Sequence, residues 1–139
     1  MADSVFVDSG YTIALLDSRD AHHGTAVRWY VQLAKARTPL VTSTAIITEL
    51  VDGFCKPHEW RKLQPVLRGF ESDPLVTTVG VDRALYDRAM ALRTARADKD
   101  WGLTDCTSFL IMQDLGITRA LSCDSHFQQA GFKALLIEP

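Results

Sequence analysis

Four carboxylate residues occupy positions in the sequence where a solvated surface charge is not expected. Asp8 closes the apolar run SVFVD, and Asp124 closes the run ALSCD. Glu49 lies within the apolar stretch IITELV, and Asp105 opens the apolar segment LTDCTSF. An isolated carboxylate near a protein core is costly in free energy, whereas several together are tolerated when a divalent cation neutralises them. These four acids therefore predict a metal site.

The types of ligand indicate which ion such a site would hold. Carboxylate oxygens, with water in the remaining positions, suit Mg²⁺ or Mn²⁺. The sequence contains no set of His and Cys residues with the spacing of a zinc site. A bound Mg²⁺ or Mn²⁺ turns a water molecule into a nucleophile and offsets charge on a phosphodiester, and two such ions lie roughly 3.5–4 Å apart. The predicted chemistry is phosphodiester hydrolysis.

Each acid also has an ordinary structural interpretation. Asp is a favoured helix N-cap and is stabilised near the positive end of a helix, which would account for Asp8, Asp105 or Asp124 taken singly. Glu49 follows its predicted helix cap by five or six residues. That distance is beyond the first turn, so a salt bridge is the main alternative role for Glu49. The sequence alone leaves open whether the four acids meet.

The elements that must position these acids alternate along the chain. Short apolar runs predict five strands, at residues 4–8, 39–43, 74–81, 120–123 and 134–137. Helical periodicity and cap residues predict the helices between them: YTIALLD, a helix capped by Asp20 and ending near Arg37, one capped by Ser43 or Thr44, one after Pro57 distorted at Pro65, one capped by Asp82, and one from Thr104 to Gly116.

Strands that alternate with helices, without hairpin signals, favour a mostly parallel sheet covered on both faces. We therefore predict an α/β fold, a three-layer α/β/α sandwich. In open sheets of this kind, ligands bind beyond the carboxyl ends of the strands, where Asp8 and Asp124 are predicted to lie.

Composition and charge limit the class of protein. A chain of 139 residues, 47% hydrophobic and 23% charged, is expected to form one globular domain over residues 1–139. The formal net charge of -2 excludes the basic field of a protein that coats duplex DNA. Three cysteines without a C-x-x-C pair argue against a secreted disulfide framework, and no basic leader or long apolar run suggests export or membrane insertion. We expect a cytoplasmic protein.

Four blocks of this sequence resemble the PIN domain family and, within it, the bacterial VapC-type toxins. The resemblance spans nearly the whole chain. The blocks carry Asp8, Glu49, Asp105 and Asp124 in the family's order: FVDSGYTIALLDSRDAHHGTAV, TSTAIITEL, LTDCTSFLIMQDLGI and ALSCDSHFQQAGF. Four blocks in the right order are much more specific than any single motif.

The resemblance implies an endoribonuclease that depends on Mg²⁺ or Mn²⁺, is held in check by a protein antitoxin, and forms a homodimer. It implies that Asp8, Glu49, Asp105 and Asp124 are both catalytic and metal-binding. It also places small hydroxyl residues near the acids: Ser9, Thr44, Thr48, Thr104 and Ser122. Some family members carry a further acid where this chain has His126, so the resemblance leaves open whether one ion binds or two.

Basic residues suggest where RNA would be held. Arg93, Arg96 and Lys99 recur every three residues before the Asp105 segment, as a stripe on a helix would. The alternative is that they form the solvated face of an amphipathic helix. A second basic segment, with Lys56, Arg61, Lys62 and Arg68, is interpreted as ordinary surface.

Three other functions are alternatives to a toxin nuclease. A PIN nuclease of RNA processing has the same site without the toxin role, and a non-catalytic PIN-fold binding module would be consistent with His126. A phospho-accepting domain of flavodoxin type usually has adjacent acids after the first strand, whereas Ser9 and Gly10 follow Asp8. Nucleotide-binding signatures of the G-x-G-x-x-G or G-K-[ST] type are absent from the sequence.

Overall fold

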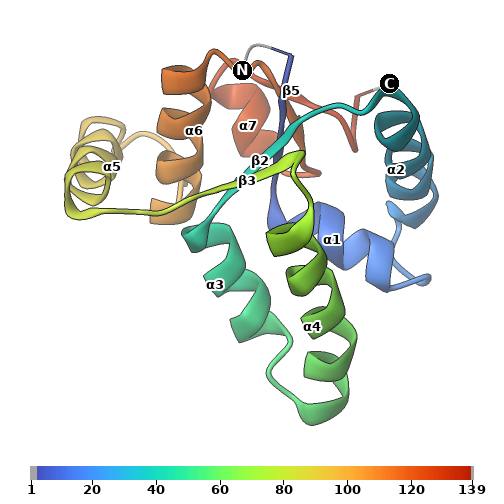
Figure 1. Ribbon diagram of the computed structural model, residues 1–139. Coiled ribbons are helices and arrows are strands. Elements are labelled where there is room, and N and C mark those ends of the chain that lie inside the picture. Colours follow the sequence, from blue (N-terminus) through green and yellow to red (C-terminus); the bar gives the residue numbers. More distant parts are fainter. Residues whose placement is uncertain (1–2, 139) are drawn as a thin grey trace.

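The central feature of the fold is a five-stranded parallel sheet (Figure 1), described by a computed structural model that covers residues 3–138. The strand order is β3-β2-β1-β4-β5, and every pair of neighbours is parallel. The strands are β1 (Val5–Val7), β2 (Leu40–Ser43), β3 (Val76–Val79), β4 (Arg119–Leu121) and β5 (Lys133–Ala134). The predicted α/β sandwich with a parallel sheet is confirmed.

Seven helices join the strands in the described part of the chain. They are α1 (Ser9–Leu16), α2 (His23–Ala36), α3 (Thr44–Gly53), α4 (Pro57–Ser72), α5 (Arg83–Ala95), α6 (Leu103–Leu115) and α7 (Ser125–Gln129). In Figure 1, α2 and α5 lie on opposite sides of the sheet, and α3 and α4 form a pair that projects beyond it. None of the helices within residues 3–138 is long and apolar enough to span a bilayer.

Alternating side chains of β1 divide the core between the two faces of the sheet. Val5 and Val7 belong to a buried cluster that includes residues of α1 and α2. Phe6 belongs to the other buried cluster, which contains residues of α3, α4, α5 and α6. This is the two-residue period of a strand. Since β1 is buried on both faces and lies in the middle of the sheet, the residue that follows it is held firmly in place.

The helix caps were predicted in part. Ser43 Oγ accepts a hydrogen bond from Ile46 N at 3.2 Å and Asp82 Oδ1 accepts one from Leu85 N at 2.8 Å, so both caps are confirmed. Gly116 ends α6 in the left-handed region at φ 69°, as expected. The prediction for Asp20 is wrong, because α2 begins at His23 and Asp20 Oδ1 instead accepts from His22 N in the preceding turn.

Other boundaries also differ from the predictions. The helix expected from Thr104 begins one residue earlier, at Leu103, with Gly102 as its N-cap. The last two strands end sooner than expected. Ile137 N and Glu138 N both donate to the carbonyl oxygen of Ala134, so the backbone turns after β5 instead of extending. The helix α4 runs continuously across Pro65.

Candidate active site

Two of the four acids follow neighbouring strands at the carboxyl edge of the sheet. Asp8 comes directly after β1, and Asp124 comes shortly after β4. The two strands are paired in parallel, with Val7 opposite Leu121. Carboxyl ends of adjacent parallel strands meet at one edge, which is where α/β folds bind ligands. The topology therefore brings together two acids that lie far apart in the sequence.

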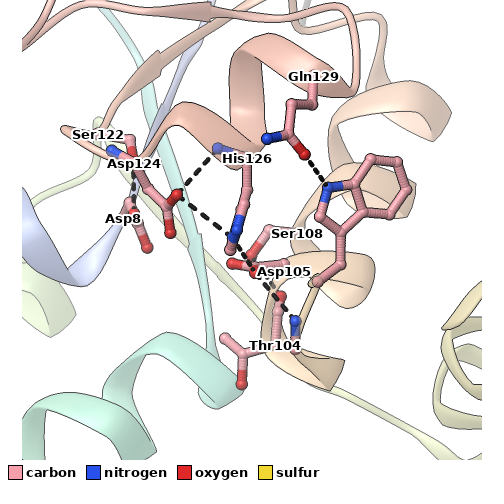
Figure 2. A network of polar contacts seen from close by, with 10 residues as sticks. Asp8, Thr104, Asp105, Ser108, Ser122, Asp124, His126 and Gln129 are labelled. Atoms are coloured by element: carbon pink, nitrogen blue, oxygen red, sulfur yellow. Dashed lines mark hydrogen bonds and ion pairs between the residues drawn. The ribbon is translucent and has the colours of Figure 1, made fainter. Parts of the chain in front are cut away.

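Ser122 joins these two acids. Its side chain is fully buried, and its hydroxyl donates a hydrogen bond of 2.7 Å to Asp8 Oδ2. The Ser122 hydroxyl oxygen also accepts a hydrogen bond of 3.0 Å from the backbone N–H of Asp124 (Figure 2). The other oxygen of Asp8 accepts from Ser9 N at 2.9 Å, at the start of α1. Both oxygens of Asp8 are thus oriented by the chain.

Asp105 and His126 form the next part of the cluster. Asp105 lies in the first turn of α6, where its Oδ2 accepts from Gly102 N at 3.1 Å. The His126 ring brings Nδ1 to 2.9 Å from that oxygen and to 3.3 Å from Asp124 Oδ1 (Figure 2). One ligand atom from each of Asp105, Asp124 and His126 lies within 4.8 Å of the other two. His126 is therefore a member of the cluster.

Glu49 joins the cluster from α3. Its Oε1 accepts a hydrogen bond of 3.1 Å from the Ser9 hydroxyl, and the Thr104 side chain also bonds to its carboxylate. Ser9 follows Asp8 and Thr104 precedes Asp105, so Glu49 contacts the immediate neighbours of two other acids. The structure brings the four acids together and places Ser9 and Thr104 beside them.

Burial and like charge both disfavour ionisation in this cluster. Burial raises the pKa of Asp8 to about 6, with smaller upward contributions from Glu49 and Asp105, while hydrogen bonds from Ser122 and Ser9 act in the opposite direction. Burial also raises the pKa of Glu49, and the charges of Asp105 and Asp124 add to the effect. Within residues 3–138, neither Lys nor Arg forms an ion pair with any of these acids. A divalent cation would offset the repulsion among these acids.

The donor set fits a divalent metal ion. Asp105 and Asp124 each offer one carboxylate oxygen, which suits Mg²⁺ and Mn²⁺, and the His126 ring adds one imidazole nitrogen. Ser122, Ser9 and Thr104 would provide the outer hydrogen bonds that orient these carboxylates toward a bound ion.

Some of the predicted site residues lie elsewhere. The Thr48 hydroxyl donates to the carbonyl of Thr44 at 2.8 Å, within its own helix. The prediction that Arg93, Arg96 and Lys99 form a stripe on one helix is wrong, because α5 ends at Ala95 and Lys99 lies beyond it. Arg96 pairs with both carboxylate oxygens of Asp98. Arg93 donates to the carbonyl of Arg96 at 3.2 Å.

The sequence analysis missed a cavity beside the acid cluster. This cavity, about 550 Å³ in volume, is lined by Glu49 and by the basic side chains of Arg19, His58 and Lys62. His58 and Lys62 are four residues apart on α4, which puts them on one helix face. That spacing was available in the sequence. Their position next to Glu49 was not, because it depends on how α4 packs against α3.

Comparisons with known proteins agree with this architecture. The PIN domain model matches residues 5–133. The 23S rRNA-specific endonuclease VapC20 of Mycobacterium tuberculosis, in strains H37Rv and CDC 1551, is 30% identical over 135 residues, which cover 92% of this chain and 95% of VapC20.

Solved structures show the same similarity. The crystal structure of Mycobacterium tuberculosis VapC20, a sarcin-ricin loop cleaving toxin, superposes with a TM-score of 0.78 at 26% identity and covers 92% of this chain and 95% of that one. FitAcB from Neisseria gonorrhoeae has a TM-score of 0.65 at 17% identity, with 94% and 95% covered, and shares the fold. With its parallel sheet and a matching family model over most of its length, this chain belongs to the PIN domain family.

Proposed function

We propose that this protein is a metal-dependent endoribonuclease, a hydrolase that acts as the toxin of a type II toxin-antitoxin pair. The observation that carries the proposal is the convergence of Asp8, Glu49, Asp105 and Asp124 at the carboxyl edge of the sheet. The convergence occurs in a chain that is 30% identical to a 23S rRNA-specific endonuclease over nearly its whole length. The similarity supports RNA as the class of substrate.

In this proposal the four acids hold Mg²⁺ or Mn²⁺. The ion, when bound, supplies an activated water and neutralises charge on the scissile phosphodiester. The chain's own residues keep the carboxylates in place for it. Ser122 orients Asp8 and fixes the backbone of Asp124, and Ser9 and Thr104 hold the carboxylate of Glu49. These bonds reduce the reorganisation needed when the cation binds.

The proposed partners are an RNA substrate, a protein antitoxin and a second copy of the chain. The similarity to VapC20 supports the RNA substrate. The antitoxin and the second copy rest on the resemblance to VapC-type toxins. Arg93, Arg96 and Lys99 stay a predicted RNA contact. The engagement of Arg96 with Asp98 and of Arg93 with the backbone weakens that prediction, since a phosphate would have to compete for both guanidinium groups. We also propose a cytoplasmic location.

The first experiment is incubation of the purified protein with a mixed RNA pool, with and without Mg²⁺ or Mn²⁺. Asp105→Ala removes a proposed ligand, and Asp98→Ala serves as the matched control because Asp98 is exposed and pairs only with Arg96 among the described residues. We expect the wild type and Asp98→Ala to cut RNA when metal is present, and Asp105→Ala to be inactive. Equal cutting by Asp105→Ala would refute the proposal.

Two further measurements separate the alternatives. Calorimetric titration with Mn²⁺ tests for a non-catalytic binding module, which should show no metal binding. Expression in a bacterial host distinguishes a toxin from an RNA-processing nuclease, because a toxin should arrest growth and Asp105→Ala should not.

A further inference from the structure

A hollow beside the acid cluster has the lining of a nucleotide-binding subsite. It lies between α1, α3 and α4, has a volume of about 550 Å³, and contains Glu49 in its wall. Ligand pockets typically measure roughly 300–1,000 Å³. We call it the flanking pocket, because Glu49 belongs both to this wall and to the acid cluster. Any molecule bound there lies next to the proposed site of hydrolysis.

The lining combines basic, acidic and apolar side chains. Arg19, His58 and Lys62 supply basic groups, Ile13, Leu16 and Phe54 supply apolar side chains, and the acids are Asp17, Glu49 and Glu59. Single-stranded RNA is recognised by cations that contact the phosphates and by apolar or aromatic side chains that contact the bases.

Lys62 and His58 are the basic groups available to a ligand. Arg19 is already paired, since Asp17 Oδ1 accepts from both its backbone N and its Nε, at 2.9 and 3.1 Å. Glu59, an acid in the same lining, is used at the start of α4, where its carboxylate accepts from Lys56 N at 3.3 Å. Within residues 3–138, the side chains of Lys62 and His58 form neither a hydrogen bond nor an ion pair, and the charge of Lys62 acts on Asp17, where it contributes to a lowered pKa of that carboxyl.

The charge of the acid cluster makes such a subsite necessary. A phosphodiester that approaches Asp8, Glu49, Asp105 and Asp124 meets like charge, and the whole chain has a formal net charge of -2. Affinity for RNA must therefore come from local cations close to the cluster.

We propose that the flanking pocket binds a nucleotide of the RNA substrate next to the phosphodiester that is cut, with Lys62 and His58 contacting its phosphate and the apolar side chains contacting its base. The inference rests on the proposed function in taking RNA as the substrate. It assigns a substrate-binding role to a basic segment that the sequence predicted to be ordinary surface.

The test compares neighbouring basic residues on the same helix. Both Arg61 and Lys62 are exposed, but only Lys62 lines the pocket. Binding of a fluorescein-labelled single-stranded RNA is measured by anisotropy with Mn²⁺ present, in the Asp8→Asn background to prevent cutting. Lys62→Ala should weaken binding about three- to tenfold and lower the slope of log K against log salt by about one. Arg61→Ala should change affinity less than about twofold.

A second readout separates this inference from the proposed function. In the protein with Asp8 intact, Lys62→Ala should raise KM for RNA cleavage and leave kcat nearly unchanged, because the contact is made in the ground state as well as in the transition state. Equal losses of affinity in Lys62→Ala and Arg61→Ala, or no loss in either, would overturn the flanking pocket. If the wild type binds RNA through Lys62 and cuts none, the pocket stands and the nuclease proposal fails.

Discussion

The Ser122 hydroxyl donates a 2.7 Å hydrogen bond to Asp8 Oδ2 across the junction of β4 and β1. Ser122 is fully buried, and the same hydroxyl oxygen accepts from Asp124 N. A single buried side chain therefore fixes the relative positions of two proposed metal ligands. Loss of an outer hydrogen bond of this kind typically weakens metal binding by about 10- to 100-fold.

Ser122→Ala should accordingly lower the affinity for Mn²⁺ by at least about tenfold, because Asp8 loses its orienting donor. Isothermal titration calorimetry measures the change. Ser108→Ala is the matched control, since Ser108 is also fully buried but its hydroxyl donates to the Thr104 carbonyl inside α6. Equal affinities in the two variants would show that the Ser122 bond has no role in metal binding.

The raised pKa of Asp8 predicts a pH dependence of stability in the absence of metal. Burial raises this pKa from 3.8 to about 6, so the folded protein binds the proton more tightly than the unfolded chain does. The free energy of unfolding should therefore fall as pH rises through this interval, and the penalty is fully present above it. With a chelator present, Asp8→Asn should be more stable than the wild type at pH 7 by roughly 3 kcal/mol.

Urea unfolding of both proteins from about pH 4 to 7 measures this difference. The difference should shrink toward acid pH, where Asp8 is protonated in the folded protein and becomes increasingly protonated in the unfolded chain. Saturating Mn²⁺ should reverse the order at pH 7, since a ligand that binds only the folded state adds to its stability. A constant difference across the pH range would contradict a raised pKa for Asp8.

The imidazole of His126 predicts a preference among divalent ions. Nitrogen ligands are accepted by Mn²⁺ more readily than by Mg²⁺, which favours oxygen. His126→Asp replaces the ring nitrogen near Asp105 and Asp124 with a carboxylate, and the ratio of Mn²⁺ to Mg²⁺ affinity should fall by roughly tenfold. Calorimetry with each ion gives the ratio. His126→Asn, which adds no charge, should weaken the binding of both ions. An unchanged ratio of Mn²⁺ to Mg²⁺ affinity in His126→Asp would exclude a role of His126 in the preference for Mn²⁺.

The end of α2 predicts a stabilising substitution. Arg37 adopts the left-handed conformation at φ 51°, as Gly116 does at φ 69° at the end of α6. A non-glycine residue pays roughly 1–2 kcal/mol for this conformation. Arg37→Gly should raise the free energy of unfolding by about 0.5–1 kcal/mol, and Gly116→Ala should lower it by about 1 kcal/mol. Denaturant unfolding of the two variants tests both signs, and a loss in Arg37→Gly would indicate an unrecognised role for that side chain.

Much of the fold could be predicted because its signals are local. Apolar runs marked all five strands, and the oxygens of Ser43 and Asp82 marked two helix starts. The prediction for Asp20 failed because an Asp side chain can accept a backbone hydrogen bond in a turn as well as at a helix N-cap. Here Asp20 accepts from His22 N in the turn before α2. The difference lies in backbone angles that the sequence does not specify.

The site could be predicted only where strand ends and family motifs pointed to it. Asp8 and Asp124 follow from the rule that parallel strands present their carboxyl ends together. The contact of His126 with Asp105 depends on how α7 packs against α6, and the flanking pocket depends on the angle between α3 and α1. Contacts between helices of this kind produce no periodic pattern in the sequence. The sequence therefore identified His126 only as a residue that replaces an acid found in some family members.

The strand order has a consequence for how activity appears during synthesis. The central strand β1 is made first, yet its neighbour β4 is made after three intervening helix-bearing connections. A nascent chain that stops before β4 has Asp8 without Ser122 or Asp124, and so has only part of the proposed catalytic centre. We therefore expect premature termination products that end before β4 to lack the proposed nuclease activity.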